Sequence, residues 1–294
     1  MTKTAFIAIV GIPNVGKSSI LNRMLGAKVA IVSDKPQTTR TKIVGVLTKG
    51  ETQLVFTDTP GFHRPRTKLG EKMVQAVGDS ISGVDACVLV VEPQGELRDG
   101  EKELVEKFRR EKLPVILVIN KIDELEKKSD LALRITELSP LYDFEAVVPV
   151  SAKTGDGMDA LEKELMSLAF ESVHYFPDDT LTDQPERVLA AEMIREKILR
   201  RLNKEIPHGT AVAIEKMHDR GDGIMDIEAT IYCEKDSHKG IIIGKGGATL
   251  KQISTYARQE MERFFDCRVN LRCWVKVKED WRNREGLIHN FGLD

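Results

Sequence analysis

The sequence predicts an α/β protein in which a domain with a mostly parallel sheet precedes a smaller α+β domain. The first observation is a glycine-rich loop at residues 11–18 that lies between an apolar strand and a helix. Apolar strands then alternate with amphipathic helices to about residue 172, which is typical of a parallel sheet covered by helices on both faces. After about residue 186 the pattern changes to helix, strand, strand, helix, helix, strand.

The loop at residues 11–18 has the sequence Gly-Ile-Pro-Asn-Val-Gly-Lys-Ser and matches the phosphate-loop pattern G-x-x-x-x-G-K-[ST] in full. An expected strand at 5–10 leads into it and an expected helix at 18–25 follows. In that geometry, backbone N–H groups and the helix N-terminus face a polyphosphate. A chance glycine turn is the alternative, and the flanking elements disfavour it. The candidate nucleotide-binding residues of the loop are Asn14, Val15, Gly16, Lys17, Ser18 and Ser19.

Length and composition suit a globular protein with two domains. The chain has 294 residues, of which 41% are hydrophobic and 31% charged. Its four cysteines lack C-x-x-C spacing, so we expect no zinc site. With no signal peptide and no apolar run of the ~18 residues that span a bilayer, we expect a reduced, cytoplasmic protein.

Charge is spread unevenly along the chain. The formal net charge is −2, but residues 239–284 carry 11 Lys and Arg against 5 Asp and Glu, a local net of +6 that leaves −8 for the remainder. A basic C-terminal segment on a mildly acidic chain predicts a polyanionic partner there. A solvated surface on a charge-rich protein is the alternative.

Secondary-structure patterns up to residue 172 predict where ligands bind. Two strands joined by a short turn, at 42–48 and 53–57, predict an antiparallel hairpin. The further strands are expected at 86–91, 114–119 and 146–150, and the helices near 67–82, 99–112, 128–139 and 157–170. Ligands in such sheets bind at the carboxyl ends of the strands, and the motifs described next follow strands directly.

Three short motifs follow the strands. Asp58-Thr59-Pro60-Gly61 can hold Mg²⁺ through water with its carboxylate, and Gly61 can bring its backbone N–H close to a γ-phosphate. In Asn120-Lys121-Ile122-Asp123, the Asp123 carboxylate can accept hydrogen bonds from N1–H and the 2-amino group of guanine, a donor pair that adenine lacks. Ser151-Ala152-Lys153 can close over the base edge. The alternatives are ordinary turns for the first motif and a helix-start cap for the second.

The second domain follows an expected linker at 173–185, which is polar, acidic and flanked by prolines. A helix is expected at 187–203, strands at 211–216, 226–233 and 268–277, and a short apolar helix and a longer helix ending near 265 on either side of a G-x-x-G loop. This order is similar to the prokaryotic-type KH domain, whose G-x-x-G loop clamps about four nucleotides of single-stranded RNA. The candidate RNA-binding residues are Gly244, Lys245, Gly246, Gly247 and Lys251. Trp274 and Trp281 can stack on bases, but we expect both to pack in the fold.

The motifs in this order resemble the translation-factor-related branch of small GTPases, and the whole chain resembles the Era GTPases of bacteria. The resemblance extends to residues 191–197 and to 275–278, followed by Trp281 and Arg282. It implies a P-loop GTPase domain with a mostly parallel sheet and a smaller type II KH domain. The boundaries expected are 1–172 for the GTPase domain, 173–185 for the linker and 186–294 for the KH domain.

The resemblance also assigns roles within the site. It implies that Lys17 contacts the β- and γ-phosphates and that Ser18 binds Mg²⁺ together with a threonine from the loop before the second strand. Thr38 and Thr39 are both candidates for that threonine, and the family pattern favours Thr39. Lys17, Thr39 and Gly61 would then act in the hydrolysis of GTP to GDP and phosphate.

The partners implied by the resemblance are ribosomal. It implies a factor that binds the 3′ end of 16S rRNA, holds single-stranded RNA in its KH domain and assists assembly of the 30S subunit. It also implies a monomer in the cytoplasm that can associate peripherally with the inner face of the cell membrane.

Three positions bear on the rate of hydrolysis. Phe62 follows the Asp58–Gly61 motif where Ras-like enzymes carry a water-orienting glutamine, and a phenylalanine cannot orient water by hydrogen bonding. We therefore expect slow intrinsic hydrolysis. Asn14 resembles the asparagine that binds K⁺ in potassium-stimulated relatives, where the cation supplies charge stabilisation of the arginine-finger kind. Arg40 could also help in this way, but we expect it to be a solvated loop cation.

Two other classes of function remain open at this point. A nucleotide-dependent phosphotransferase would use the same phosphate loop, but the guanine-specific pattern at residues 120–123 disfavours it. An RNA-binding module with a non-hydrolysing, regulatory nucleotide site would release no phosphate under any condition. Nucleotide preference and phosphate release distinguish these classes.

Overall fold

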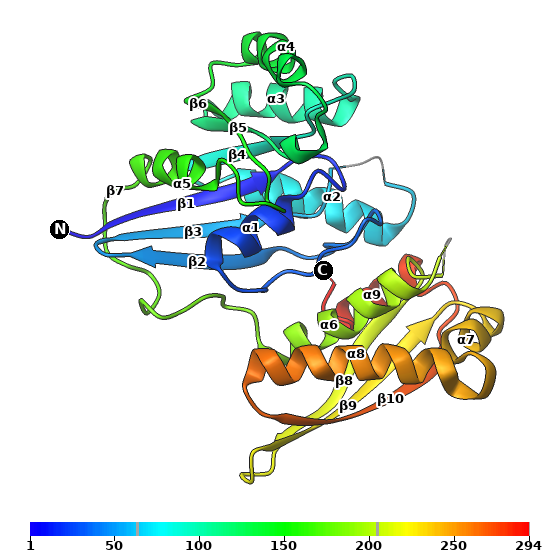
Figure 1. The fold of residues 1–294 in the computed structure, drawn as a ribbon. Coiled ribbons are helices and arrows are strands. Elements are labelled where there is room, and N and C mark those ends of the chain that lie inside the picture. The colour runs from blue at the N-terminus through cyan, green and yellow to red at the C-terminus, as the bar shows by residue number, and fades with distance from the viewer. Residues whose placement is uncertain (63–64, 204–205, 294) are drawn as a thin grey trace. The chain divides into compact units, whose positions relative to one another are not determined.

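The computed structural model describes residues 1–62, 65–203 and 206–293, and the chain divides into two compact units (Figure 1). The first unit comprises residues 1–30, 39–64 and 73–183, and the second comprises 31–38, 65–72 and 184–294. Two short segments from the N-terminal part of the sequence, 31–38 and 65–72, thus belong to the second unit. The boundaries expected from the sequence remain a prediction.

The first unit is built on one mostly parallel sheet, in which two strands run antiparallel to their neighbours. The strand order is β2 (Ile43–Lys49), β3 (Thr52–Asp58), β1 (Lys3–Val10), β4 (Ala86–Val91), β5 (Val115–Ile119) and β6 (Ala146–Pro149). β2 pairs antiparallel with β3, which confirms the expected hairpin. A two-residue strand, β7 (Phe170–Glu171), pairs antiparallel with β1 and was not expected. The mostly parallel sheet predicted from the alternating pattern is confirmed.

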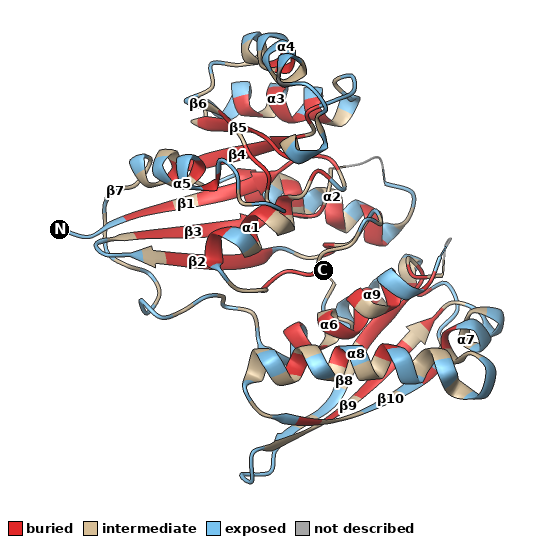
Figure 2. Ribbon diagram, viewed as in Figure 1, coloured by how far each residue is buried: buried red, intermediate tan, exposed pale blue. Residues whose placement is uncertain are grey.

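Helices cover both faces of this sheet because successive strand residues point to opposite sides. The helices are α1 (Lys17–Leu25), α2 (Lys68–Ile81), α3 (Asp99–Glu111), α4 (Lys128–Leu138) and α5 (Met158–Ser167). In β1, Ile7 and Ile9 belong to an apolar cluster shared with α1 and α5, whereas Ala8 and Val10 belong to a second cluster shared with α2, α3 and α4. Burial on both faces explains why residues 5–10 of β1 are an unbroken apolar run, and Figure 2 shows this strand largely in red.

The second unit has the order helix, strand, strand, helix, helix, strand that the sequence predicts. Its elements are α6 (Glu186–Arg201), β8 (Ala211–Asp219), β9 (Ile224–Cys233), α7 (Asp236–Ile243), α8 (Ala248–Phe265) and β10 (Arg268–Val277). The three strands form a sheet in the order β10-β9-β8, in which β10 is parallel and β8 antiparallel to β9. A short final helix, α9 (Glu285–Asn290), follows the last strand.

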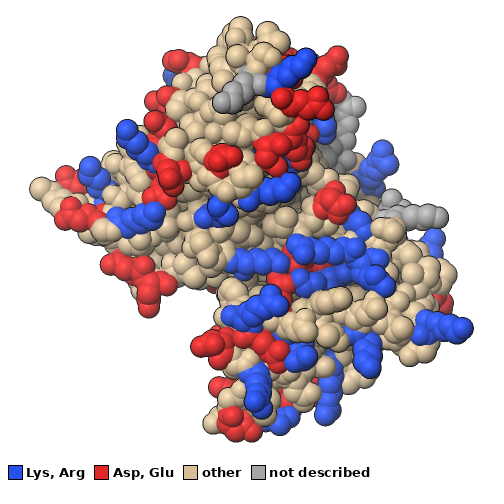
Figure 3. All heavy atoms as spheres, viewed as in Figure 1, with Lys and Arg blue, Asp and Glu red and all other residues tan. Residues whose placement is uncertain are grey.

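The helices α6, α7 and α8 bury one face of the three-stranded sheet. The shared core includes Ile194 and Ile198 of α6, Ile227 and Ile231 of β9, and Ala257 of α8. Lys and Arg side chains gather on the visible face of this unit (Figure 3). Within the part of the chain that the structure describes, no helix is long and apolar enough to cross a membrane.

Candidate nucleotide site and RNA-binding loop

The phosphate loop joins the end of β1 to the start of α1, and two of its residues have conformations that require glycine. Gly11 has a φ of +151°, and a Cβ there would lie 2.5 Å from the carbonyl oxygen of Val90. Gly16 has a φ of +98°, and a Cβ there would lie 2.2 Å from the side-chain nitrogen of Asn120. The loop therefore packs directly on the ends of β4 and β5. Because α1 begins at Lys17, its first backbone N–H groups are available to an anion.

The side chain of Lys17 is buried and folds back over the loop. Its Nζ donates to the carbonyl oxygens of Gly11 at 3.1 Å and Ile12 at 3.0 Å. Burial lowers the pKa of Lys17 to about 8, an effect that the nearby Asp58 carboxylate opposes. An ammonium group has three donors, so Lys17 can exchange these carbonyls for phosphate oxygens.

The three residues expected to hold Mg²⁺ meet in one cluster. Ser18 Oγ donates to Asp58 Oδ2 at 2.6 Å, the hydroxyls of Ser18 and Thr39 lie 3.0 Å apart, and Thr39 Oγ1 donates to Asp58 Oδ2 at 3.5 Å. Thr38 instead turns away, because its Oγ1 donates to the carbonyl oxygen of Lys35 at 2.6 Å. Of the two threonine candidates, the structure therefore brings Thr39 to the cluster.

The chemistry of this cluster fits a hard divalent cation. Asp58 is fully buried, and its Oδ1 has no hydrogen-bond partner among the described residues. Burial raises the pKa of Asp58 to about 6, while Lys17 and the hydroxyls of Ser18 and Thr39 oppose the shift. An all-oxygen donor set with one buried, unpaired carboxylate oxygen is what Mg²⁺ prefers. The described residues contain no group of three or more His, Cys, Asp or Glu that could hold a metal ion.

The segment after β3 lies against the phosphate loop. A Cβ on Gly61 would lie 2.6 Å from Cα of Pro13, and the backbone N–H of Phe62 donates to the carbonyl oxygen of Gly11 at 3.1 Å. The Phe62 ring packs on the apolar cluster shared by α2, α3 and α4. Gly61 is thus held beside the loop, and Phe62 fills space without offering a polar atom from its side chain.

Arg40 differs from its prediction. It was expected as a solvated cation, but only 3% of it is exposed, so that prediction is wrong. Arg40 lies between Thr39, whose hydroxyl points into the cluster, and the buried start of β2 at Ile43. The fold encloses nearly the whole side chain, including Nε of the guanidinium, so its charge is not solvated.

Asn120 braces the site, whereas Asp123 is presented at its edge. Asn120 is 2% exposed; its Nδ2 donates to the carbonyl oxygen of Val15 at 2.8 Å, and its Oδ1 accepts from the backbone N–H of Ala152 at 3.1 Å. Asp123 accepts from Ser151 Oγ at 2.7 Å and pairs with Lys153 Nζ at 3.3 Å. The hydrogen bond from Ser151 is the main reason that the pKa of Asp123 is lowered. Asp123 is therefore an ionised acceptor, as recognition of the guanine edge requires.

The remaining nucleotide-site candidates lie around this frame. Asn14 is exposed at the tip of the loop with a φ of +69°. Val15 is buried, and Ser19 is half-buried in the first turn of α1. Lys121 has a left-handed backbone conformation and pairs with Glu92, which follows β4.

Two supporting residues were missed by sequence reasoning. Thr59 is fully buried, and its Oγ1 donates to the carbonyl oxygen of Ile9 at 2.9 Å, which anchors the Asp58–Gly61 motif to β1. Glu92 orients Lys121. The place of Thr59 inside the D-x-x-G motif, directly after a buried strand, could have indicated a supporting role. No feature of the sequence indicates a role for Glu92.

The G-x-x-G loop connects α7 to α8 and is shaped by positive φ angles. Gly244 has a φ of +75°, and a Cβ there would lie 2.2 Å from Thr249 Oγ1. Gly246 and Gly247 also have positive φ, at +59° and +79°, but nothing lies within 4 Å of a Cβ at either position. The loop therefore leaves open space beside its last two glycines, where a nucleic-acid backbone can approach.

The charged and aromatic side chains of this unit divide into exposed and packed groups. Lys245 and Lys251 are exposed at the loop and on the first turn of α8. Trp281 is fully buried, with its Nε1 donating to the carbonyl oxygen of Gly209 at 2.9 Å, as expected for packing. Trp274 is 45% exposed on β10, so the expectation that it packs in the fold is wrong for nearly half of its surface. The alternation along β10 places it on the sheet face opposite the helices.

Comparison with known proteins identifies relatives that match the whole chain. A family model described as a 50S ribosome-binding GTPase matches residues 6–121, and a KH domain model matches residues 205–282. GTPase Era of Clostridioides difficile (strain 630) is 50% identical over 299 residues, covering 100% of this chain and 99% of the relative. GTPase Era of Ruminiclostridium cellulolyticum is 47% identical over 290 residues, covering 99% of this chain and 97% of the relative.

Solved structures agree over the same length. A variant of Aquifex aeolicus Era bound to GDP and AlF4⁻ superposes with a TM-score of 0.95 at 37% identity, covering 99% of each chain. Era in complex with MgGDPNP and nucleotides 1506–1542 of 16S ribosomal RNA also has a TM-score of 0.95 at 37% identity, covering 100% of this chain and 99% of that one.

Proposed function

The chain belongs to the Era family of GTPases, and we therefore propose that it is a GTP-driven switch that binds the 3′ end of 16S rRNA and assists 30S subunit assembly. As a member of this family it hydrolyses GTP, which sets aside both the phosphotransferase and the non-hydrolysing RNA-binding module. The observation that supports the proposal best is the meeting of Ser18, Thr39 and Asp58 beside the phosphate loop.

We propose that the phosphate loop and its neighbours hold GTP and GDP. The backbone N–H groups of Val15 to Ser19 surround the phosphates, and Lys17 exchanges its loop carbonyls for β- and γ-phosphate oxygens. Ser18, Thr39 and Asp58 would hold Mg²⁺, which neutralises charge on the phosphates when bound. Gly61, fixed beside Pro13, offers its backbone N–H to the γ-phosphate.

We propose that the base lies between the motifs at 120–123 and 151–153. Asp123 accepts from guanine, Ser151 and Lys153 keep it ionised and oriented, and Ala152 closes over the base edge from the position that Asn120 sets. Adenine would leave a carboxylate without its donors, which is costly.

Hydrolysis is proposed to be slow in the absence of partners. Phe62 packs against apolar side chains and supplies no group that orients water. We propose that Asn14, which is exposed at the loop tip, holds K⁺ near the β- and γ-phosphates.

We propose that the G-x-x-G loop binds single-stranded RNA through Gly244 to Gly247 together with Lys251. Open space beside Gly246 and Gly247, the exposed cations and the +6 segment at 239–284 support this. The solved Era complex with nucleotides 1506–1542 of 16S rRNA supports the 3′ end as the ligand. We further propose a monomer in the cytoplasm that associates peripherally with the membrane, which sedimentation and cell fractionation would test.

One experiment tests the base and a second tests the RNA. Asp123→Asn should shift the nucleotide preference from guanine to xanthine, and an unchanged preference would refute the base assignment. Lys245→Asp should weaken binding of a fluorescent oligonucleotide with the 16S 3′-end sequence roughly 10-fold while leaving GDP affinity intact. Lys163→Asp, an exposed α5 residue with the same charge change, is the matched control. Equal losses in both lysine variants would show that only overall charge matters.

A further inference from the structure

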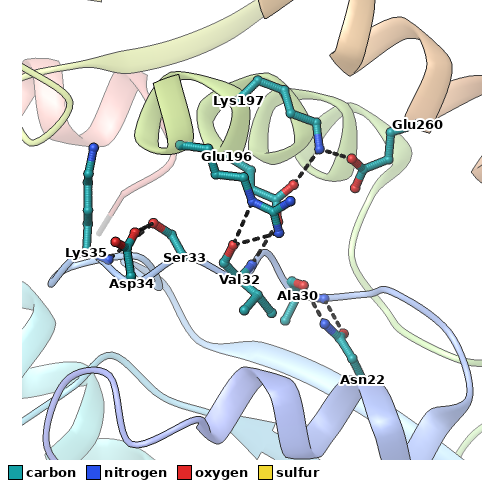
Figure 4. A network of polar contacts seen from close by, with 10 residues as sticks. Asn22, Ala30, Val32, Ser33, Asp34, Lys35, Glu196, Lys197 and Glu260 are labelled. Atoms are coloured by element: carbon teal, nitrogen blue, oxygen red, sulfur yellow. Dashed lines mark hydrogen bonds and ion pairs between the residues drawn. The ribbon is translucent and has the colours of Figure 1, made fainter. Parts of the chain in front are cut away.

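The stretch between α1 and Thr39 is held by α6. Residues 31–38 belong to the second unit, and their polar contacts run along this helix (Figure 4). The backbone N–H of Val32 donates to Glu196 Oε1 at 3.0 Å, and the Arg200 guanidinium donates to the carbonyl oxygen of Val32 at 3.1 Å. Arg200 also donates to Glu196 Oε1 at 3.0 Å. Both polar groups of the Val32 backbone are therefore fixed by side chains of α6.

The same helix and its end hold the segment at two further points. Lys35 Nζ donates to the carbonyl oxygen of Leu202 and, at 3.2 Å, to Asn203 Oδ1. The Arg195 guanidinium donates to the carbonyl oxygen of Thr38. The segment is therefore held at Val32, Lys35 and Thr38, which restricts the position of its last residue, Thr38.

Glu196 is the central residue of this cluster. It is fully buried, and its carboxylate also accepts from Lys197 Nζ at 2.6 Å. Lys197 in turn pairs with Glu260 on α8, the helix that starts at the G-x-x-G loop. A buried ion pair is often no more stabilising than an apolar replacement of the same volume, because both charges lose their hydration. Stability alone therefore does not account for a buried Glu196, whereas fixing the Val32 backbone does.

We propose that Glu196 is a positioning residue for GTP hydrolysis, which acts by fixing residues 31–38 and, through the next peptide bond, the hydroxyl of Thr39. That hydroxyl lies 3.0 Å from Ser18 Oγ and 3.5 Å from Asp58 Oδ2. A loose segment would let Thr39 leave the cluster without disturbing the phosphate loop. The inference rests on the proposed role of Thr39 in holding Mg²⁺.

A GTP analogue with Mg²⁺ and GDP should respond differently if Glu196 acts through Thr39. The γ-phosphate and its Mg²⁺ are what order this kind of segment, and loss of the γ-phosphate releases it. Loosening the segment should therefore weaken the binding of a GTP analogue and raise its Mg²⁺ requirement, while GDP affinity is unchanged. A residue with a merely structural role would alter both nucleotides together or neither.

The experiment compares variants of the full chain by fluorescent-nucleotide binding and by hydrolysis. Glu196→Ala should lower the affinity for Mg²⁺ and GDPNP, and kcat, at least ~10-fold, with GDP affinity within about 2-fold. Glu196→Gln keeps the volume and one acceptor oxygen for the Val32 N–H, so its losses should be clearly smaller than those of the alanine variant. If the alanine variant fails to fold, Arg200→Ala carries the test, because it removes the donor to the Val32 carbonyl oxygen from a largely exposed side chain and should change the same quantities in the same direction. Glu186→Ala, an exposed glutamate in the first turn of the same helix, is the matched control and should change neither quantity.

A double-mutant cycle with Thr39→Ala decides the route of action. If Glu196 acts through Thr39, Glu196→Ala should cause less than about a 2-fold further loss of kcat and GDPNP affinity when Thr39 is already alanine. Equal losses in both backgrounds, or an equal loss of GDP affinity, would overturn the inference and leave the role of Thr39 intact. A Thr39→Ala variant with normal Mg²⁺ requirement and kcat would refute the proposed role of Thr39, and the inference with it.

Discussion

Replacing Asn120 by alanine should destabilise the first unit as well as weaken nucleotide binding. The Asn120 side chain makes two hydrogen bonds, from Nδ2 to the carbonyl oxygen of Val15 at 2.8 Å and to Oδ1 from the backbone N–H of Ala152 at 3.1 Å. It therefore ties the phosphate loop to the loop after β6. The substitution removes both bonds in a place where water has little access, since only 2% of Asn120 is exposed.

The size of the effect follows from these two bonds. Each hydrogen bond contributes about 1 kcal/mol net, and a buried group left without its partner costs about 1–3 kcal/mol. The carbonyl of Val15 and the N–H of Ala152 both lose a partner, so the free energy of unfolding should fall by roughly 2–4 kcal/mol. In a domain of ~150–250 residues that corresponds to a lowering of Tm by roughly 5–15 °C.

Thermal unfolding of the nucleotide-free chain, followed by circular dichroism, measures this effect. Asp123→Ala is the matched control, because Asp123 lies at the edge of the site and its side chain pairs with Ser151 and Lys153 rather than bracing the phosphate loop. It should abolish guanine preference with little change in Tm. If Asn120→Ala lost GDP affinity but kept its Tm within about 1 °C, Asn120 would act on the ligand directly and the bracing argument would be refuted.

Three further outcomes follow from the two sites. Because the pKa of Asp58 is raised to about 6 in the metal-free fold, Mg²⁺-dependent GDPNP binding should weaken as the pH falls through 6. A raised native pKa of an acid also means that the metal-free fold gains stability as the pH falls, so its Tm in EDTA should rise from pH 7.5 to 6, an increase absent in Asp58→Asn. Asn14→Ala should remove any excess of hydrolysis in K⁺ over Na⁺ buffer, and equal rates in the unaltered chain would refute the K⁺ site. Gly244→Ala should lower Tm, because its Cβ meets Thr249, whereas Gly246→Asp should weaken RNA binding with a smaller loss of Tm, because its space is open and only the positive φ opposes a side chain.

The strands of the first unit could be predicted closely because burial on two faces leaves a simple signal. The run at 86–91 is a strand with the bounds expected, and every one of its residues is buried. Short helices and strands with few apolar residues have no such pattern and could not be predicted in this way. The two residues of β7 depend on pairing with β1, and the six residues of α9 depend on packing of Ile288. Neither contact can be read from local sequence.

Which residues meet in the site was predictable only where a motif fixes the backbone. The position of Asp58 follows from the end of β3. The family resemblance favoured Thr39 over Thr38, but the contact of Thr38 with Lys35 that turns Thr38 away could not be predicted from the sequence. The burial of Arg40 and of Glu196 was equally hidden. A charged residue in a sequence is normally predicted to be exposed, because charged side chains are rarely fully buried. Only the contacts in the folded chain show the exceptions.

Three buried carboxylates of this protein are buried for different structural reasons. Glu101 is 2% exposed, but its carboxylate accepts from the backbone N–H of Arg98 at the start of α3, so a local helix cap explains it. Asp58 has no such cap and lies where a cation is needed. Glu196 accepts instead from Val32, a residue 164 positions away. A backbone partner so far along the chain cannot cap the glutamate's own helix. The carboxylate of Glu196 therefore fixes the distant segment 31–38, which Thr39 follows directly. The burial of Glu196 is therefore best explained by what that segment has to hold in place.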